Sequence, residues 1–133
     1  MKYDAVVIGS GQGGNPLAHR LADLGWTVAL VEQSHLGGTC INTGCTPTKT
    51  MVASAQVAHY ARNAARWGVL TGGVRVDLPA IVARKKRVVE SFRAGQQSRV
   101  DAWKSLHLHR GHAPGQLKSK RQTWEGEASH LHI

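Results

Sequence analysis

The stretch AVVIGSGQGG, residues 5–14, joins a short apolar run to a cluster of glycines. The run predicts a strand over residues 3–9 that is buried on both faces, as strands of parallel sheets are. Apolar residues then recur at helical spacing until Gly25, a residue type common at helix ends. A second apolar run, residues 27–31, predicts another strand. The chain therefore begins with a βαβ unit, which predicts an α/β fold around a parallel sheet.

The glycines follow the G-x-G-x-x-G pattern, and they do so between a strand and a helix, where the pattern indicates dinucleotide binding. Gly9 permits a tight turn, Gly11 lets a pyrophosphate approach the backbone, and Gly14 allows the helix to pack closely on the strand. Gly13 adds an N–H donor at the helix start. Glu32 ends the second strand near the spacing of roughly 20 residues expected for an acid that binds a ribose hydroxyl. These features favour FAD or NAD over a glycine turn that binds nothing.

The two cysteines, Cys40 and Cys45, lie close together in the sequence. Pro47 fits the first turn of a long helix predicted over residues 46–66, so Cys45 lies at the helix start, where the macrodipole lowers a thiol pKa. Gly44 gives the preceding turn the freedom to bring the two cysteines within disulfide distance. This arrangement predicts a redox-active dithiol; the alternative is two incidental buried cysteines.

The string GGTCINTGCTPTK, residues 37–49, resembles the redox-active segment of the pyridine nucleotide-disulfide oxidoreductases, the family of glutathione reductase, dihydrolipoamide dehydrogenase and mercuric reductase. In that family the segment follows an FAD-binding βαβ unit, as it does here. The resemblance implies a Rossmann-like FAD/NAD(P)-binding domain with a long redox helix. It also implies that Cys40 exchanges with substrate and that Cys45 faces the flavin as a thiolate.

The same resemblance assigns further FAD contacts. Gly38 and Thr39 would touch the cofactor from the redox segment, and Lys49 would lie by the isoalloxazine ring, where a cation stabilises the reduced flavin. The late sequence GHA, residues 111–113, is similar to a family segment whose backbone contacts the adenine end of FAD. Ala113 is therefore included among the cofactor-binding residues.

A complete family member passes hydride from NAD(P)H to FAD and then electrons to the cysteine pair, whose thiols reduce a disulfide or metal-ion substrate. Such members are homodimers, several times longer, with an NAD(P)H-binding domain and a dimerisation domain that are absent here. We therefore expect an oxidoreductase fragment with an incomplete parallel sheet, FAD as its cofactor, NAD(P)H and a small-molecule substrate only in the complete enzyme, and no activity alone.

The organisation along the chain predicts two parts. Residues 1–113 form a partial FAD-binding domain, and residues 114–133 form a divergent, disordered tail, which a frameshift or another truncation would explain. Within the first part, Asp77 is expected to cap a second, basic helix over residues 79–106, with an interruption near Gly95. A short strand around residues 107–109 would follow.

The formal net charge of +9 is concentrated in the run Arg84–Arg87 and in the last third of the chain. This charge allows an alternative function, a noncatalytic basic fragment that binds polyanions. We do not expect a nucleic-acid partner, because a solvated helix face explains the run more simply. His107 and His109 alternate on one strand and share a face, but without a third ligand we expect no metal site. No apolar run reaches the roughly 20 residues of a membrane span and no signal peptide is evident, so we expect a soluble, cytoplasmic protein.

Overall fold

The computed structural model describes residues 1–113, and the tail predicted over residues 114–133 lies outside the described residues. Three strands form a parallel sheet in the order β1-β2-β3, which confirms the predicted α/β fold. The strands are β1 Ala5–Ile8, β2 Val28–Glu32 and β3 Leu106–Arg110. The helices are α1 Gly14–Asp23, α2 Gly38–Asn42, α3 Cys45–Asn63 and α4 Leu78–Asp101, with the 3₁₀ helix η1 at Ala64–Trp67.

The core lies between one face of the sheet and the helices α1 and α4. Val28 and Leu30 of β2 are fully buried there, against Ala18 of α1 and Val100 of α4. The fully buried apolar residues of α1 are alanines, Leu21 packs beside them, and Leu17 is half-exposed. Small side chains let α1 approach the sheet closely, which brings its first turn to the end of β1.

The burial predicted for the first strand is wrong. All five residues of β2 are buried, but in β1 only Val7 is, and Ile8 is 52% exposed. Within the part of the chain that the structure describes, β1 pairs with β2 alone and is an edge strand. An apolar run identifies a strand of a parallel sheet, but its burial depends on neighbours that the run does not encode.

Several predicted boundaries also differ. The segment before the second cysteine contains the short helix α2. Helix α4 passes Gly95 without a break and ends at Asp101, and β3 begins directly at Leu106. The cap at the start of α4 is confirmed, because the Asp77 carboxylate accepts a hydrogen bond of 2.9 Å from the N–H of Ala80.

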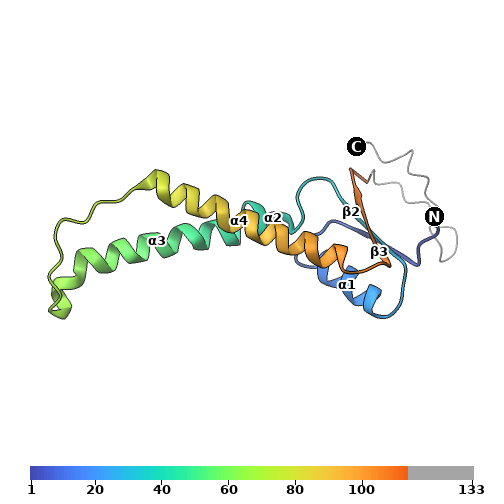
Figure 1. Ribbon diagram of the computed structural model, residues 1–133, viewed down its shortest axis with the longest axis horizontal. Coiled ribbons are helices and arrows are strands. Elements are labelled where there is room, and N and C mark those ends of the chain that lie inside the picture. Colours follow the sequence, from blue (N-terminus) through green and yellow to red (C-terminus); the bar gives the residue numbers. More distant parts are fainter. Residues whose placement is uncertain (114–133) are drawn as a thin grey trace.

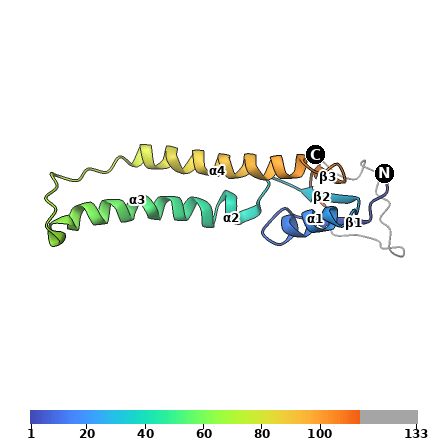
Figure 2. The same cartoon turned by 60° about the horizontal axis from the view of Figure 1, so that its bottom comes forward.

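Helices α3 and α4 run side by side as a long hairpin that projects away from the sheet (Figures 1 and 2). Arg84 of α4 donates to the Thr50 carbonyl at 3.0 Å and to the Ser54 hydroxyl at 3.2 Å, both on α3. The basic run is therefore not simply a solvated face, because its first arginine joins the two helices. None of the described helices combines the length and the apolar character that crossing a membrane requires.

Candidate functional site

The glycine turn between β1 and α1 has two kinds of glycine. Gly9 has a φ of 88°, in the left-handed region that favours glycine. A Cβ on Gly14 would lie 1.9 Å from the Gly9 carbonyl oxygen, so no larger residue fits there. A Cβ on Gly11 or Gly13 would meet nothing within 4 Å. Gly9 and Gly14 thus shape the turn, and Gly11 and Gly13 leave its outer side open to a ligand.

The start of α1 is suited to an anion. Gly13 is the N-cap, no side chain caps this end within the described residues, and the first turn holds no acid. Unsatisfied N–H groups and the positive end of the helix dipole favour a phosphate at such a position. The backbone therefore fits the pyrophosphate of a dinucleotide.

Glu32 holds this turn from the end of β2. Its buried carboxylate accepts hydrogen bonds from the N–H and the hydroxyl of Ser10, at 2.9 and 2.6 Å, and from the N–H of Ser34 at 2.9 Å. Burial raises the pKa of the Glu32 carboxyl, but these hydrogen bonds and the charge of Arg110 outweigh it, so the pKa lies below the ordinary value. A carboxylate has about four acceptor sites, which leaves capacity for a ribose hydroxyl.

The low pKa of Glu32 predicts a pH-dependent stability. Because the folded-state pKa is below the unfolded-state value, the carboxylate stabilises the fold at higher pH, and this contribution is lost as the pH falls through the folded-state pKa. We expect Glu32→Gln to cost about 2 kcal/mol at neutral pH, because it removes charge-assisted hydrogen bonds. Thermal unfolding followed by circular dichroism from about pH 7 to about pH 3 should show the two proteins converging. If the difference in stability between the two proteins stayed constant over this pH range, the role given to Glu32 would be contradicted.

The redox segment lies directly on the glycine turn. The N–H of Gly37 donates to the Ser10 carbonyl at 3.2 Å and to the Ser10 hydroxyl at 3.1 Å. A Cβ on Gly38 would lie 2.8 Å from the Gly11 Cα, so these two backbones are in close contact. The two motifs that the sequence gives separately therefore form one site.

Cys40 and Cys45 are brought together at the junction of α2 and α3, where both are free thiols. Cys40 is half-buried, and Cys45 is exposed as the first residue of α3. A hydrogen bond to Cys45 raises the pKa of the Cys40 thiol, and so do burial and the negative charge of an ionised Cys45. A backbone hydrogen bond from Cys45 and the charge of Lys49 act in the opposite direction. The net effect is that the pKa of the Cys40 thiol lies above its ordinary value.

Gly44 makes the close approach of the cysteines possible. Its N–H donates to the Thr39 carbonyl at 2.7 Å, which folds the chain back between α2 and α3. A Cβ at this position would lie 3.0 Å from that carbonyl oxygen and 3.5 Å from the Cys40 Cα. Thr39 and Lys49 are both exposed.

The segment predicted to contact adenine lies beside Glu32. The N–H of Gly111 donates to the Glu32 carbonyl at 3.0 Å, and the Nδ1 atom of His112 lies 3.0 Å from the Gln33 Oε1 atom. Ala113 follows as a half-buried residue. The structure thus places residues 111–113 at the ribose end of the predicted site and the cysteines at its other end.

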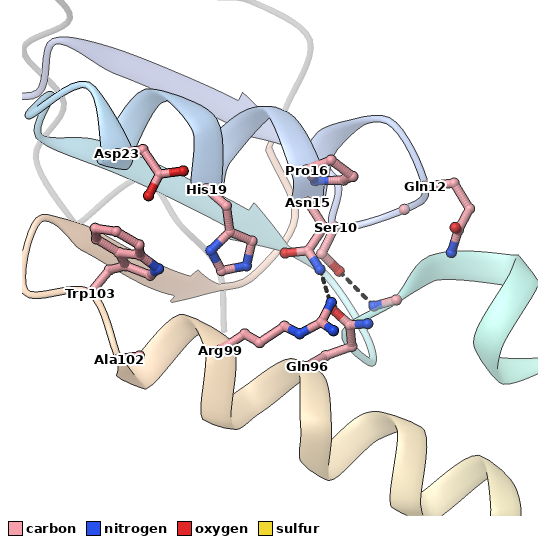
Figure 3. Close-up of a pocket in the computed structure, with 12 residues that line it drawn as sticks. Ser10, Gln12, Asn15, Pro16, His19, Asp23, Gln96, Arg99, Ala102 and Trp103 are labelled. Atoms are coloured by element: carbon pink, nitrogen blue, oxygen red, sulfur yellow. Dashed lines mark hydrogen bonds between the residues drawn. The ribbon is translucent and has the colours of Figure 1, made fainter.

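A cavity of about 450 Å³ runs between α1 and α4 and begins at the glycine turn (Figure 3). Two buried atoms at this cavity, Asn15 Oδ1 and His19 Nε2, have no hydrogen-bond partner within the described residues. Burial lowers the pKa of His19 most, the charge of Arg99 lowers it further, and Asp23 opposes both. Sequence reasoning missed this cavity, because its side chains come from two helices far apart in the chain and form no motif.

The predicted histidine pair does share one face of β3. The Tyr3 hydroxyl lies 2.7 Å from the Nε2 atom of His109, and the Tyr3 ring packs edge-on against both His107 and His109. This cluster lies on the side of the sheet away from the core, since the two histidines alternate with the core residues Leu106 and Leu108.

Comparison with known proteins relates the whole described region to one family. Residues 3–122 match the family model described as "Pyridine nucleotide-disulphide oxidoreductase". The dihydrolipoyl dehydrogenases of Chlamydia muridarum and Bacillus subtilis are each 44% identical, over 93 and 94 residues. These alignments cover 70% and 71% of this chain and 20% of each relative. The chain thus spans about one fifth of the length of these curated relatives.

Solved structures agree with this relationship. The Cu(II) complex of the HOCl-induced flavoprotein disulfide reductase RclA from Escherichia coli superimposes with a TM-score of 0.68 at 37% identity, covering 84% of this chain and 22% of that chain. Another structure of that reductase gives a TM-score of 0.66, also at 37% identity, over 80% of this chain and 21% of the other. The parallel sheet and its helices are therefore Rossmann-like, as predicted.

Proposed function

Because this chain belongs to the pyridine nucleotide-disulphide oxidoreductase family, we propose that it is the FAD-binding, dithiol-carrying part of a flavoprotein disulfide reductase. The observation that carries the proposal is the hydrogen bonding of Gly37 to Ser10, which fixes the redox segment on the glycine turn. A dinucleotide that lies across this turn extends from Glu32 toward Cys45. One site then serves both cofactor and thiols.

The residues around the turn fit FAD. Gly11 and Gly13 leave room for the pyrophosphate, and Glu32 retains acceptor capacity for the ribose. Bound FAD would supply two-electron chemistry beside the thiols. Gly9 and Gly14 hold the turn in shape, so they act on the cofactor through the backbone.

Further contacts complete the proposed FAD site. Gly38 and Thr39 would contact the cofactor from the redox segment, and residues 111–113, ending at Ala113, would bound its adenine end. The positive charge of Lys49 lowers the pKa of Cys40. The same charge would stabilise the reduced isoalloxazine ring of FAD.

The two cysteines take different roles in this proposal. Cys45 and burial raise the pKa of the Cys40 thiol, which favours its protonated form. Cys45, exposed at the start of α3, is the thiolate that faces the flavin, and the helix N-terminus stabilises its charge. Cys40 is then the thiol that exchanges with substrate.

The activity of the complete enzyme extends beyond this chain. We propose that NAD(P)H supplies the electrons and that the Cys40–Cys45 dithiol passes them to a small disulfide or a metal ion. A homodimer is the proposed assembly, as in the family. The relatives named above are flavoproteins or dihydrolipoyl dehydrogenases, which supports a disulfide as the substrate class.

Equilibrium dialysis against FAD and against NAD tests the proposed function. We expect the folded chain to take up one FAD, weakly, and to bind NAD less well. Gly11→Ala is the matched variant, because its Cβ meets no protein atom within 4 Å and obstructs only a ligand. It should weaken FAD binding roughly tenfold while leaving the circular dichroism spectrum unchanged. A folded chain that takes up no FAD at millimolar concentration would contradict the proposal.

A further inference from the structure

The side chain of Asn42 makes hydrogen bonds to the backbone of the redox segment and of the turn before it. Asn42 is the last residue of α2, and its Nδ2 atom donates to the carbonyls of His35, Leu36 and Gly38 at 3.2, 3.1 and 2.8 Å. The first two carbonyls belong to the turn that leads from β2 into α2, and the third belongs to the first residue of α2. One amide group therefore sets the shape of the turn that enters α2, the helix that carries Cys40.

A second residue fixes the orientation of this amide from a distant helix. The Nε atom of Arg93, on α4, donates to the Asn42 Oδ1 atom at 2.6 Å across 51 positions of sequence. With Oδ1 held by a cation, Nδ2 must point toward the three carbonyls, since the two ends of an amide differ in donor and acceptor character. Pro47 of α3 and Val89 of α4, both buried, line a small hollow of about 180 Å³ beside the pair.

We propose that Arg93 and Asn42 are positioning residues that set the disulfide equilibrium of the cysteine pair. The inference rests on the proposed function and adds residues from outside the two motifs. Asn42 is neutral, and the cation whose charge lowers the pKa of Cys40 is Lys49. Arg93 and Asn42 act by keeping α2 in place, so that Cys40 stays beside Cys45.

Holding two thiols together raises their effective concentration toward each other. In exchange with glutathione, the S–S bond of oxidised glutathione breaks and one S–S bond forms between the two cysteines. Oxidised glutathione takes up the two electrons and two protons of the dithiol and becomes two molecules of reduced glutathione. Loosening α2 lowers the effective concentration of Cys40 beside Cys45. We therefore expect loss of the Arg93–Asn42 bond to reduce the equilibrium constant of this reaction about fivefold.

The experiment equilibrates the full chain with glutathione buffers, traps free thiols with an alkylating reagent and measures the oxidised fraction by mass. Arg93→Leu should show the fivefold loss, and Asn42→Asp, which turns a second acceptor toward the three carbonyls, should show at least as much. Arg93→Lys keeps a cationic donor, so its equilibrium constant should lie within about twofold of the wild-type value. The matched control is Arg87→Leu, an exposed arginine of the same helix without a hydrogen bond inside the described region, and it should change nothing.

The outcomes separate this inference from the proposed function. If the wild-type chain forms no intramolecular disulfide, the proposed function fails. If wild type forms it and both Arg93→Leu and Asn42→Asp leave the equilibrium unchanged, only the positioning role is overturned. Circular dichroism establishes that each variant is folded, and Asn42→Asp decides the question should Arg93→Leu not fold, because it retains the partner of Arg93. A loss in Arg93→Leu that Arg93→Lys does not repair at all also contradicts the proposal.

Discussion

Gly14→Ala is expected to destabilise the chain by about 4 kcal/mol, enough to unfold much of it at 37 °C. The added Cβ would lie 1.9 Å from the Gly9 carbonyl oxygen and 3.3 Å from a methyl carbon of Val7. Both neighbours are fixed, one as backbone and the other as a buried strand residue, so relief requires α1 to move off β1. Urea unfolding followed by circular dichroism measures the loss directly.

The control for this substitution lies three residues away. Gly11→Ala adds the same methyl group in the same turn, but into open space. Its free energy of unfolding should lie within about 0.5 kcal/mol of the wild-type value. The pair therefore separates the glycine that shapes the fold from the glycine that admits the cofactor. Equal stability of the two variants would show that α1 does not pack on β1 as described.

Replacing either cysteine by serine is expected to abolish the intramolecular disulfide and, in the complete enzyme, all thiol–disulfide turnover. The two variants should nevertheless differ in the reactivity of the thiol that remains. Cys45 raises the pKa of Cys40 through a hydrogen bond and through its charge, so Cys45→Ser should lower the pKa of Cys40 and speed its alkylation at neutral pH. The pH dependence of iodoacetamide labelling, read by mass spectrometry, checks both expectations.

Thr43→Ser is the matched control for the cysteine variants. Thr43 lies between the two cysteines, is exposed, and can keep its contact with the Thr39 carbonyl as a serine. It should form the disulfide as wild type does. A Cys45→Ser chain whose Cys40 reacts no faster than in wild type would contradict the coupling of the two thiols.

Local patterns were sufficient for the parts of the site that lie on one stretch of chain. The glycine turn, the strand that ends at Glu32 and the helix that starts at Cys45 each follow from residues within a few positions of one another. The end of α4 could not be predicted from nearby residues, because apolar residues continue at helical spacing beyond Asp101. There the chain must reverse to enter β3, and Trp103 and Leu106 make the turn hydrogen bonds that do so.

The contacts that tie the site together could not be predicted from the sequence. Arg93 meets Asn42 only because α4 returns along α3, and the cavity at His19 needs Arg99 from the same helix. Such pairs depend on how helices far apart in sequence are packed, which no local spacing encodes. The exposure of Ile8 has the same origin, since it reflects which strand neighbours β1 has.

The central claim is that a dinucleotide on the glycine turn meets a thiol pair at the start of α3. The visible absorption spectrum of the FAD-loaded chain, recorded before and after reduction of the disulfide with a dithiol, tests it most directly. The account predicts a broad long-wavelength absorbance after reduction, from charge transfer between the Cys45 thiolate and the flavin, which Cys45→Ser lacks and Cys40→Ser retains. A folded, FAD-loaded chain whose spectrum is indifferent to the state of both cysteines would contradict it.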